Sequence, residues 1–205
     1  LLNALSICAL AISLPSCIED NVETQIMHYS PEEYATLQQK LNLPEERFDY
    51  TVNVIANNFG GTSMIPINSA KATLGRVLFY DKQLSHNNTV ACASCHQQEA
   101  GFADNKAQSE GFNGGLTKRN SLALASVANF ESSYGGGNTA NFNQNAAFLW
   151  DERANSILEQ SKIAIEDNVE MGMDIDDLAN KLAQEDYYRI LFHKAYGSSE
   201  ITPNR

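Results

Sequence analysis

Basic residues are scarce in this chain. It has 205 residues, with 14 Lys and Arg against 25 Asp and Glu, which leaves a formal net charge of -11. A nucleic-acid-binding surface needs a basic face to neutralise phosphates, so the charge argues against nucleic acid and leaves room for a basic protein partner. With 43% hydrophobic residues, the composition is that of a globular protein.

Cysteine and long apolar runs are also scarce. Four cysteines are too few for a scaffold built on disulfides. Beyond residue 20 the chain has no apolar run of the roughly 18 residues that a membrane-spanning helix needs. No segment shows sustained alternation of polar and apolar residues, so the sequence predicts an all-α fold.

The first 17 residues have the character of an export signal. Residues 1–14 are apolar and uncharged, and the run ends in Leu14-Pro15-Ser16-Cys17 before the chain turns polar. A small residue followed by Cys resembles a bacterial lipoprotein signal, in which Cys17 is lipidated. The alternatives are an ordinary cleaved signal peptide and a buried helix. We expect a periplasmic protein anchored to the envelope at Cys17, with a tether over 18–30 and a domain over 31–205.

The run Ala91-Cys92-Ala93-Ser94-Cys95-His96 has the C-x-x-C-H pattern of c-type haem attachment. Two thiols one helical turn apart can add to the two haem vinyl groups, and the adjacent His96 can bind the iron. With 4 Cys and 4 His in 205 residues, a shuffled chain shows this pattern roughly once per thousand trials. The motif therefore predicts covalently bound haem c, held by Cys92 and Cys95 with His96 on the iron.

Other interpretations of this motif fit less well. A structural zinc site needs four ligands, and the remaining His28, His86 and His193 form no second paired motif. A thioredoxin-like pair would need a βαβ context, and a disulfide across two residues is strained. We interpret the other three histidines as surface residues.

The pattern of the chain predicts helices separated by glycine-rich loops. Ser30-Pro31-Glu32-Glu33 is a good helix start. Loops are expected over 97–120 and 131–146, and the latter contains Gly135-Gly136-Gly137. Helices are expected over 31–43, 69–80, 121–129, 153–166, 174–185 and 185–196.

Several motifs in one order carry a family resemblance. Residues 70–196 resemble the N-terminal, peroxidatic domain of the bacterial di-haem cytochrome c peroxidases and their methylamine-maturation relatives. The residues that carry this resemblance are Leu74-Gly75-Arg76-Val77-Leu78-Phe79-Tyr80-Asp81, Leu84-Ser85, Cys92 to His96, Arg119-Asn120-Ser121, Phe148-Leu149-Trp150-Asp151-Glu152-Arg153 and Val169-Glu170-Met171.

The resemblance implies a role for individual residues. His96 matches the proximal ligand of the peroxidatic haem, and Trp150 matches the tryptophan that conducts electrons between the two haems. Gln160 and Glu170 match the distal-pocket pair, with Glu170 as the acid–base residue. Asn120 matches a calcium ligand near the domain interface. The implied fold is a cytochrome c-like helical haem domain.

The chemistry supports the role of Glu170 independently. Cleavage of peroxide at iron needs a proton moved from one oxygen to the other, and a desolvated carboxylate with a raised pKa can move it. The flanking Val169 and Met171 are an apolar setting. The alternative is a solvated acid at a helix end. Arg153 pairs either with Asp151 or with a haem propionate.

The chain departs from the family pattern in the loop after the haem motif. Many members have a His there that caps the resting iron, and counting back from Arg119 places Phe112 at this position. We therefore expect an iron that is five-coordinate or holds water and needs no reductive activation. His86 is a less favoured sixth ligand.

The second departure is that the chain contains one C-x-x-C-H motif, whereas these peroxidases have two. We interpret the chain as the N-terminal half of a longer di-haem enzyme. It would reduce hydrogen peroxide with electrons from a small cytochrome c or cupredoxin, commonly as a homodimer. One alternative is a mono-haem electron carrier with Met64, Met171 or Met173 as sixth ligand. Another is a maturation oxidase that acts on a protein side chain.

Overall fold

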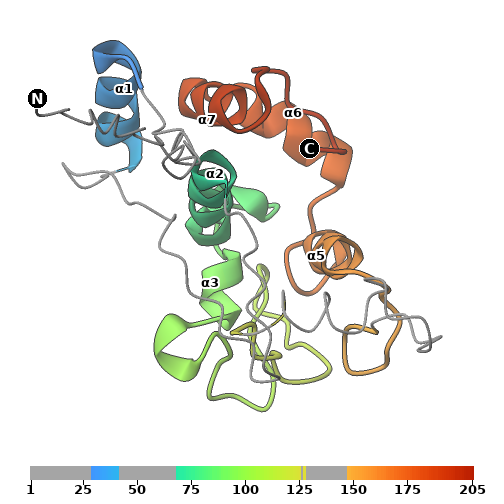
Figure 1. Ribbon diagram of the computed structural model, residues 1–205. Helices are drawn as coiled ribbons and strands as arrows, with labels where there is room; N and C mark the ends of the chain where they lie inside the picture. The colour runs from blue at the N-terminus through green and yellow to red at the C-terminus, as the bar shows by residue number, and fades with distance from the viewer. Residues whose placement is uncertain (1–28, 42–67, 126, 128–146) are drawn as a thin grey trace, which may run out of the picture.

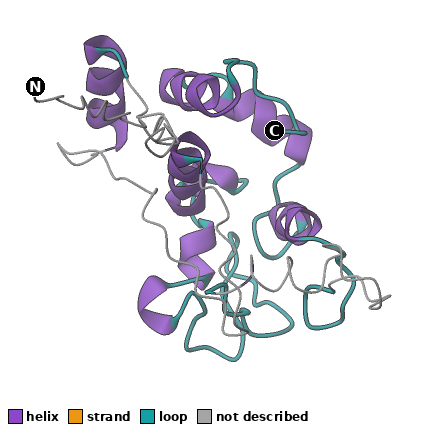
Figure 2. Ribbon diagram, viewed as in Figure 1, coloured by secondary structure: helices purple, strands orange, loops and turns teal. Residues whose placement is uncertain are grey.

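The chain folds into helices joined by long irregular segments (Figures 1 and 2). The computed structural model describes residues 29–41, 68–125, 127 and 147–205. These residues contain no strand, only isolated bridges, so the predicted all-α fold is confirmed. Within the same residues no helix is long and apolar enough to cross a membrane. The α-helices are α1 Pro31–Leu41, α2 Ser69–Tyr80, α3 Cys92–Cys95, α5 Ile157–Glu166, α6 Ile175–Leu182 and α7 Asp186–Tyr196, with 3-10 helices η1 Lys82–Leu84 and η2 Gln98–Ala100.

Polar side chains start these helices. Ser30 and Glu33 form a capping box at α1, because the Glu33 N–H donates to Ser30 Oγ and the Ser30 N–H to Glu33 Oε2. Asn68 Oδ1 accepts from the Lys71 N–H at α2, and Asp174 Oδ1 accepts two N–H groups at α6. The predicted signal, residues 1–17, and residues 18–28 of the predicted tether lie outside the described residues.

The hydrophobic core lies between α2 and α7, with α1 and α6 at its edges (Figure 1). The fully buried side chains of Leu37, Tyr188 and Leu191 come from α1 and α7. The short helix α3 packs against α2 and leads from this core into the loop-rich half of the molecule (Figure 1). The haem motif therefore begins against helix α2 of the core and ends among loops.

A polar network fastens the segment before α3 to the C-terminal helices. Asp81 Oδ2 accepts hydrogen bonds from the hydroxyl groups of Tyr187 and Tyr188. Lys181 Nζ donates to the carbonyl oxygens of Gln83 and Ser85 at 2.7 and 3.2 Å. Because these groups are partly buried, each bond satisfies a polar atom that would otherwise be costly to bury.

Two of the predicted elements differ from the structure. Of the helix expected over 121–129, residues 121–125 are not helical and not buried, whereas Val127 is helical. Residues 121–125 hydrogen-bond instead to a neighbouring loop: Ser121 Oγ accepts from the Asp104 N–H, and the Leu124 N–H donates to the Phe102 carbonyl. The helix expected over 153–166 begins at Ile157, because Ser156 caps it by accepting from the Glu159 N–H and Ala154 is paired with Phe148. Residues 42, 43, 126 and 128–146 lie outside the described residues.

Candidate functional site

The two cysteines of the motif lie on one turn of α3 and are not joined in a disulfide. Both side chains are half-buried, and burial is the main cause that raises the pKa of each thiol. Ser94 tightens this turn, since the Ala91 N–H donates to Ser94 Oγ at 3.0 Å. Two protonated thiols one turn apart are therefore available on the same short helix.

His96 is held by its own loop. Its Nδ1 lies 2.9 Å from the Phe102 carbonyl oxygen. A carbonyl can only accept, so Nδ1 carries the hydrogen and the Nε2 lone pair is left to bind a metal. Phe102 reaches this position through a left-handed backbone with φ of 60°, a conformation that bulky residues rarely adopt. Its N–H donates to the Gln97 carbonyl, which closes the loop around His96.

These residues fit haem c. Two free thiols on one helical turn, followed by an imidazole whose tautomer leaves Nε2 available, are the donor set that the cofactor requires. The loop that follows influences Cys95, because the Ser109 hydroxyl lowers the pKa of its thiol and so opposes the effect of burial. Ser109 is buried and donates to Asp104 Oδ2 at 2.7 Å. The sequence analysis missed Asp104 and Ser109, whose only signal was their place in a polar loop.

Glu170 lies in the turn that follows α5. Asp167 Oδ1 shapes this turn by accepting the N–H groups of Val169 and Glu170. Burial raises the pKa of the Glu170 carboxyl most, and the charge of Asp167 raises it further, while Arg153 opposes the shift. The carboxylate also raises the pKa of the Cys95 thiol. Glu170 is therefore desolvated and lies close to the haem motif, unlike a solvated acid at a helix end.

Phe112 lies beside the Glu170 turn. Its N–H donates to the Glu170 carbonyl at 3.1 Å, and its ring lies so close to Gly172 that a Cβ there would be 2.4 Å from Phe112 Cε1. The ring of His86 meets the Phe112 ring edge-on, at 5.8 Å between centroids. Phe112, which stands where many family members have the capping His, thus lies next to His86, the less favoured sixth ligand.

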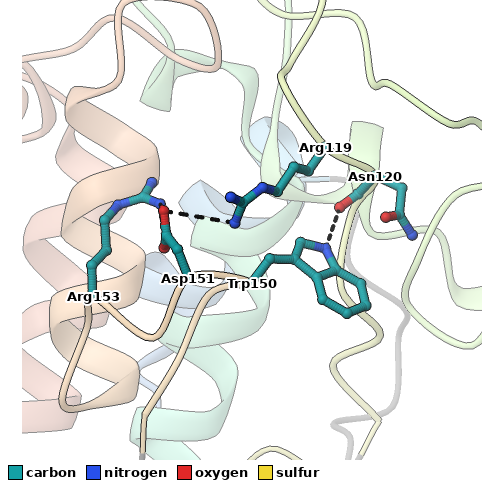
Figure 3. A network of polar contacts seen from close by, with 5 residues as sticks. All are labelled: Arg119, Asn120, Trp150, Asp151 and Arg153. Atoms are coloured by element: carbon teal, nitrogen blue, oxygen red, sulfur yellow. Dashed lines mark hydrogen bonds and ion pairs between the residues drawn. The ribbon is translucent and has the colours of Figure 1, made fainter.

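Trp150 lies in a turn that is attached to the Arg119-Asn120 segment (Figure 3). Its Nε1–H donates to the Asn120 carbonyl at 3.0 Å. Asp151 contacts Arg153 at 2.6 Å and Arg119 at 3.7 Å, so Arg153 pairs with Asp151. The sequence analysis assigned no role to Arg119, because an ion pair between distant segments leaves no periodic signal.

The remaining predicted residues are Gln160, Asn120 and three methionines. Gln160 is half-buried on α5, and no hydrogen bond joins its side chain to Glu170 in the described part of the chain. Asn120 is exposed, and the residues described contain no group of three or more His, Cys, Asp or Glu that could hold a metal ion. Calcium at Asn120 stays a prediction. Met171 and Met173 are buried in the hydrophobic core, where they serve packing; Met64 lies outside the described residues.

Comparison with known proteins identifies the family of this chain. The family model for di-haem cytochrome c peroxidase matches residues 69–205. The chain belongs to this family. Membership implies haem c and places the protein among the haem oxidoreductases.

Relatives of two kinds are similar to the chain. It is 31% identical over 140 residues to a methylamine utilization protein MauG of Methylophilus methylotrophus, covering 68% of this chain and 37% of the relative. It is 29% identical over 143 residues to a cytochrome c551 peroxidase of Nitrosomonas europaea, covering 70% and 38%. The chain thus spans well under half the length of these relatives.

Solved structures agree on the architecture. A MauG-like protein associated with microbial copper homeostasis matches with a TM-score of 0.51 at 28% identity, covering 64% of this chain and 35% of that one. The di-haem peroxidase BthA of Burkholderia thailandensis matches with a TM-score of 0.56 at 20% identity, covering 70% and 37%. The latter likeness shows the fold alone.

Proposed function

We propose that this chain is the peroxidatic haem domain of a periplasmic di-haem cytochrome c peroxidase. It would reduce hydrogen peroxide to water with electrons from a small cytochrome c or cupredoxin. The observation that carries the proposal is Glu170, a half-buried carboxyl with a raised pKa that lies beside the haem motif. A plain electron carrier has no use for such a group, whereas peroxide chemistry needs one.

The proposed roles follow from the contacts. When bound at Cys92, Cys95 and His96, the haem supplies an iron centre at which the oxygen–oxygen bond is reduced. His96 Nε2 is aimed by the Nδ1–H bond to the Phe102 carbonyl, which also makes the imidazole more basic. Glu170 takes the proton from one peroxide oxygen and returns it to the other. Its raised pKa makes the carboxyl a stronger base, and so a better proton acceptor, than an ordinary glutamate.

Phe112 would keep the sixth iron position open. A phenyl ring cannot bind iron, and its contact with Gly172 keeps it next to the turn that carries Glu170. The proposed enzyme therefore reacts with peroxide without prior reduction. His86 contacts the same ring and is the alternative ligand that spectroscopy would reveal.

Electrons would enter through Trp150 from a second haem domain. The indole is 54% exposed, which leaves a face available to another domain. The net charge of -11 favours a basic electron donor, with association rates that fall as ionic strength rises. Export, lipidation at Cys17, calcium at Asn120 and a homodimer complete the proposal.

The test is peroxide reduction by the haem-loaded protein, with reduced cytochrome c as donor. Glu170→Gln is expected to lower turnover by about 10²–10⁴-fold, the usual contribution of a positioned acid–base group. The matched control is Glu166→Gln, since Glu166 is exposed on α5 and pairs with Lys162; it should leave turnover unchanged. Equal turnover in both variants would remove Glu170 from the mechanism.

A second candidate function is a maturation oxidase of the MauG type. The observation in its favour is that the identity to a MauG, 31%, is as high as the identity to a cytochrome c551 peroxidase, 29%. Stoichiometry separates the two functions. A peroxidase consumes two reduced cytochromes for each peroxide, whereas a maturation oxidase consumes peroxide without oxidising the cytochrome and modifies a protein partner instead.

A further inference from the structure

The turn that carries Trp150 has an unusual backbone. Phe148 and Ala154 pair across its base, and both are buried. Between them Leu149 and Glu152 adopt left-handed conformations, with φ of 70° and 60°. Residues with side chains rarely adopt this conformation unless their surroundings impose it. Something outside the turn must therefore hold its exposed tip in place.

Two adjacent residues of the tip reach two adjacent residues of another segment (Figure 3). The Trp150 Nε1–H donates to the Asn120 carbonyl at 3.0 Å, and Asp151 Oδ2 lies 3.7 Å from a guanidinium nitrogen of Arg119. A nitrogen of Arg153 donates to both oxygens of Asp151, at 2.6 and 2.7 Å. Asp151 is thus the centre of a bridge that joins the turn to the 119–120 segment.

This bridge contributes to geometry more than to global stability. The side chains of Arg119 and Asp151 are 52% and 39% exposed, and exposed ion pairs add little to the free energy of unfolding. The indole itself is half-exposed and lines an open hollow of about 410 Å³ with Ala107, Arg119 and Asn120. Because packing covers only about half of the indole, its orientation also depends on the hydrogen bond at its edge.

We propose that Asp151 is a positioning residue for Trp150: by bridging Arg119 and Arg153 it keeps the indole hydrogen-bonded to the Asn120 carbonyl and in one orientation. The proposal rests on the proposed function in one respect only, namely that Trp150 carries electrons. Under that function, Asp151 sets the geometry of the electron path without touching the haem.

Trp150 is the only tryptophan of the chain, which makes a direct test possible. Ultraviolet resonance Raman spectra of the haem-loaded protein report whether an indole N–H is hydrogen-bonded, and only one indole contributes. Asp151→Asn keeps the size of the side chain and removes its charge. We expect the spectrum to shift toward a free indole N–H, and Asp151→Glu to restore much of the original signal.

The matched control is Glu152→Gln. Glu152 is the next residue, is exposed, and makes no ion pair with any residue that the structure describes. The Glu152→Gln substitution removes the same charge from the same turn. The Raman spectrum of this variant should therefore equal that of the unmodified protein. A second variant, Arg119→Gln, breaks the bridge from the other segment and should reproduce the effect of Asp151→Asn.

The outcomes separate this proposal from the proposed function. A hydrogen-bonded indole in both Asp151→Asn and Arg119→Gln would overturn the positioning role. If the indole is released, the rate of electron transfer between the haems of the di-haem enzyme decides the second question. A fall of about tenfold or more is expected, because misplacement by about 1 Å can cost on the order of 100-fold. A released indole with an unchanged rate would confirm the bridge and remove Trp150 from the electron path.

Discussion

The backbone N–H of Phe112 donates a hydrogen bond to the carbonyl of Glu170 at 3.1 Å. The Phe112 carbonyl in turn accepts from Asn87 Nδ2 and from the Thr89 hydroxyl. The loop after the haem motif, the segment before it and the turn with the acid–base candidate are therefore tied at one residue. A change in the backbone conformation at position 112 should therefore also displace the turn that carries Glu170.

Phe112→His tests the open sixth position. The unmodified haem-loaded protein is expected to be high-spin in the ferric state and to react at once with peroxide. The histidine variant should become low-spin and react only after reduction, because the imidazole would bind the iron. Absorption and EPR spectra measure both states. His86→Ala is the control: if the unmodified protein is low-spin and this variant is high-spin, His86 is the ligand and the interpretation of Phe112 is wrong.

Gly172→Ala tests the contact that fixes the Phe112 ring. The new Cβ would lie 2.4 and 2.5 Å from two ring atoms, at a residue whose φ is +62°. Overpacking and a left-handed alanine should together lower the free energy of unfolding by about 2 kcal/mol or more. Gly75→Ala is the matched control, since nothing lies within 4 Å of its Cβ position in α2. It should stabilise the protein by about 0.5–1 kcal/mol. Urea unfolding that shows equal effects would contradict the close contact.

Local patterns allowed much of this structure to be predicted. The helix expected over 69–80 is α2 with the same bounds, because apolar residues that recur along one helical face are a local signal. The C-x-x-C-H motif predicted the cofactor for a similar reason, since both thiols and the imidazole lie within one turn and its next residue.

Other features depended on contacts between distant segments. Residues 121–125 have helix-forming alanines and leucines, yet hydrogen bonds from Asp104 and to Phe102 hold them in a non-helical conformation. Tertiary contacts override helix propensity in such short segments. The bridge from Asp151 to Arg119 could not be predicted either, because its two residues share no period in the sequence.

Lys181→Met tests the network that holds the segment before α3. Lys181 Nζ donates to two carbonyl groups and to Asn88 Oδ1, and burial lowers the pKa of this amine while Asp81 opposes the shift. Removing the donor takes this partner from the partly buried Gln83 carbonyl, while the Ser85 carbonyl keeps the Asn88 N–H. The loss should lower the free energy of unfolding by about 1–3 kcal/mol. Lys162→Met, at an exposed pair on α5, should change it by no more than about 0.5 kcal/mol. A similar loss in both variants would show that Lys181 contributes only its charge.

Glu170→Gln should change how stability depends on pH. Burial raises the pKa of Glu170 above the ordinary value of 4.5 for this side chain, so the folded protein holds this proton more tightly than the unfolded chain does. As pH rises from 4.5 through the folded pKa, the unfolded state loses the proton first and the free energy of unfolding falls. The glutamine has no proton to lose, so the variant should be more stable than the unmodified protein above this window.

The difference should close at low pH, where the carboxyl is neutral in both states. Urea unfolding of the haem-loaded protein and of the variant, at pH values on either side of the window, measures the difference directly. Glu166→Gln is again the control, because its carboxyl is exposed and paired only with Lys162; it should show no such gain. A gain for Glu170→Gln that is the same at every pH would mean that the carboxyl is not desolvated in the folded protein. Its suitability as the proton-transfer group beside the haem would then be lost, because that role depends on the same raised pKa.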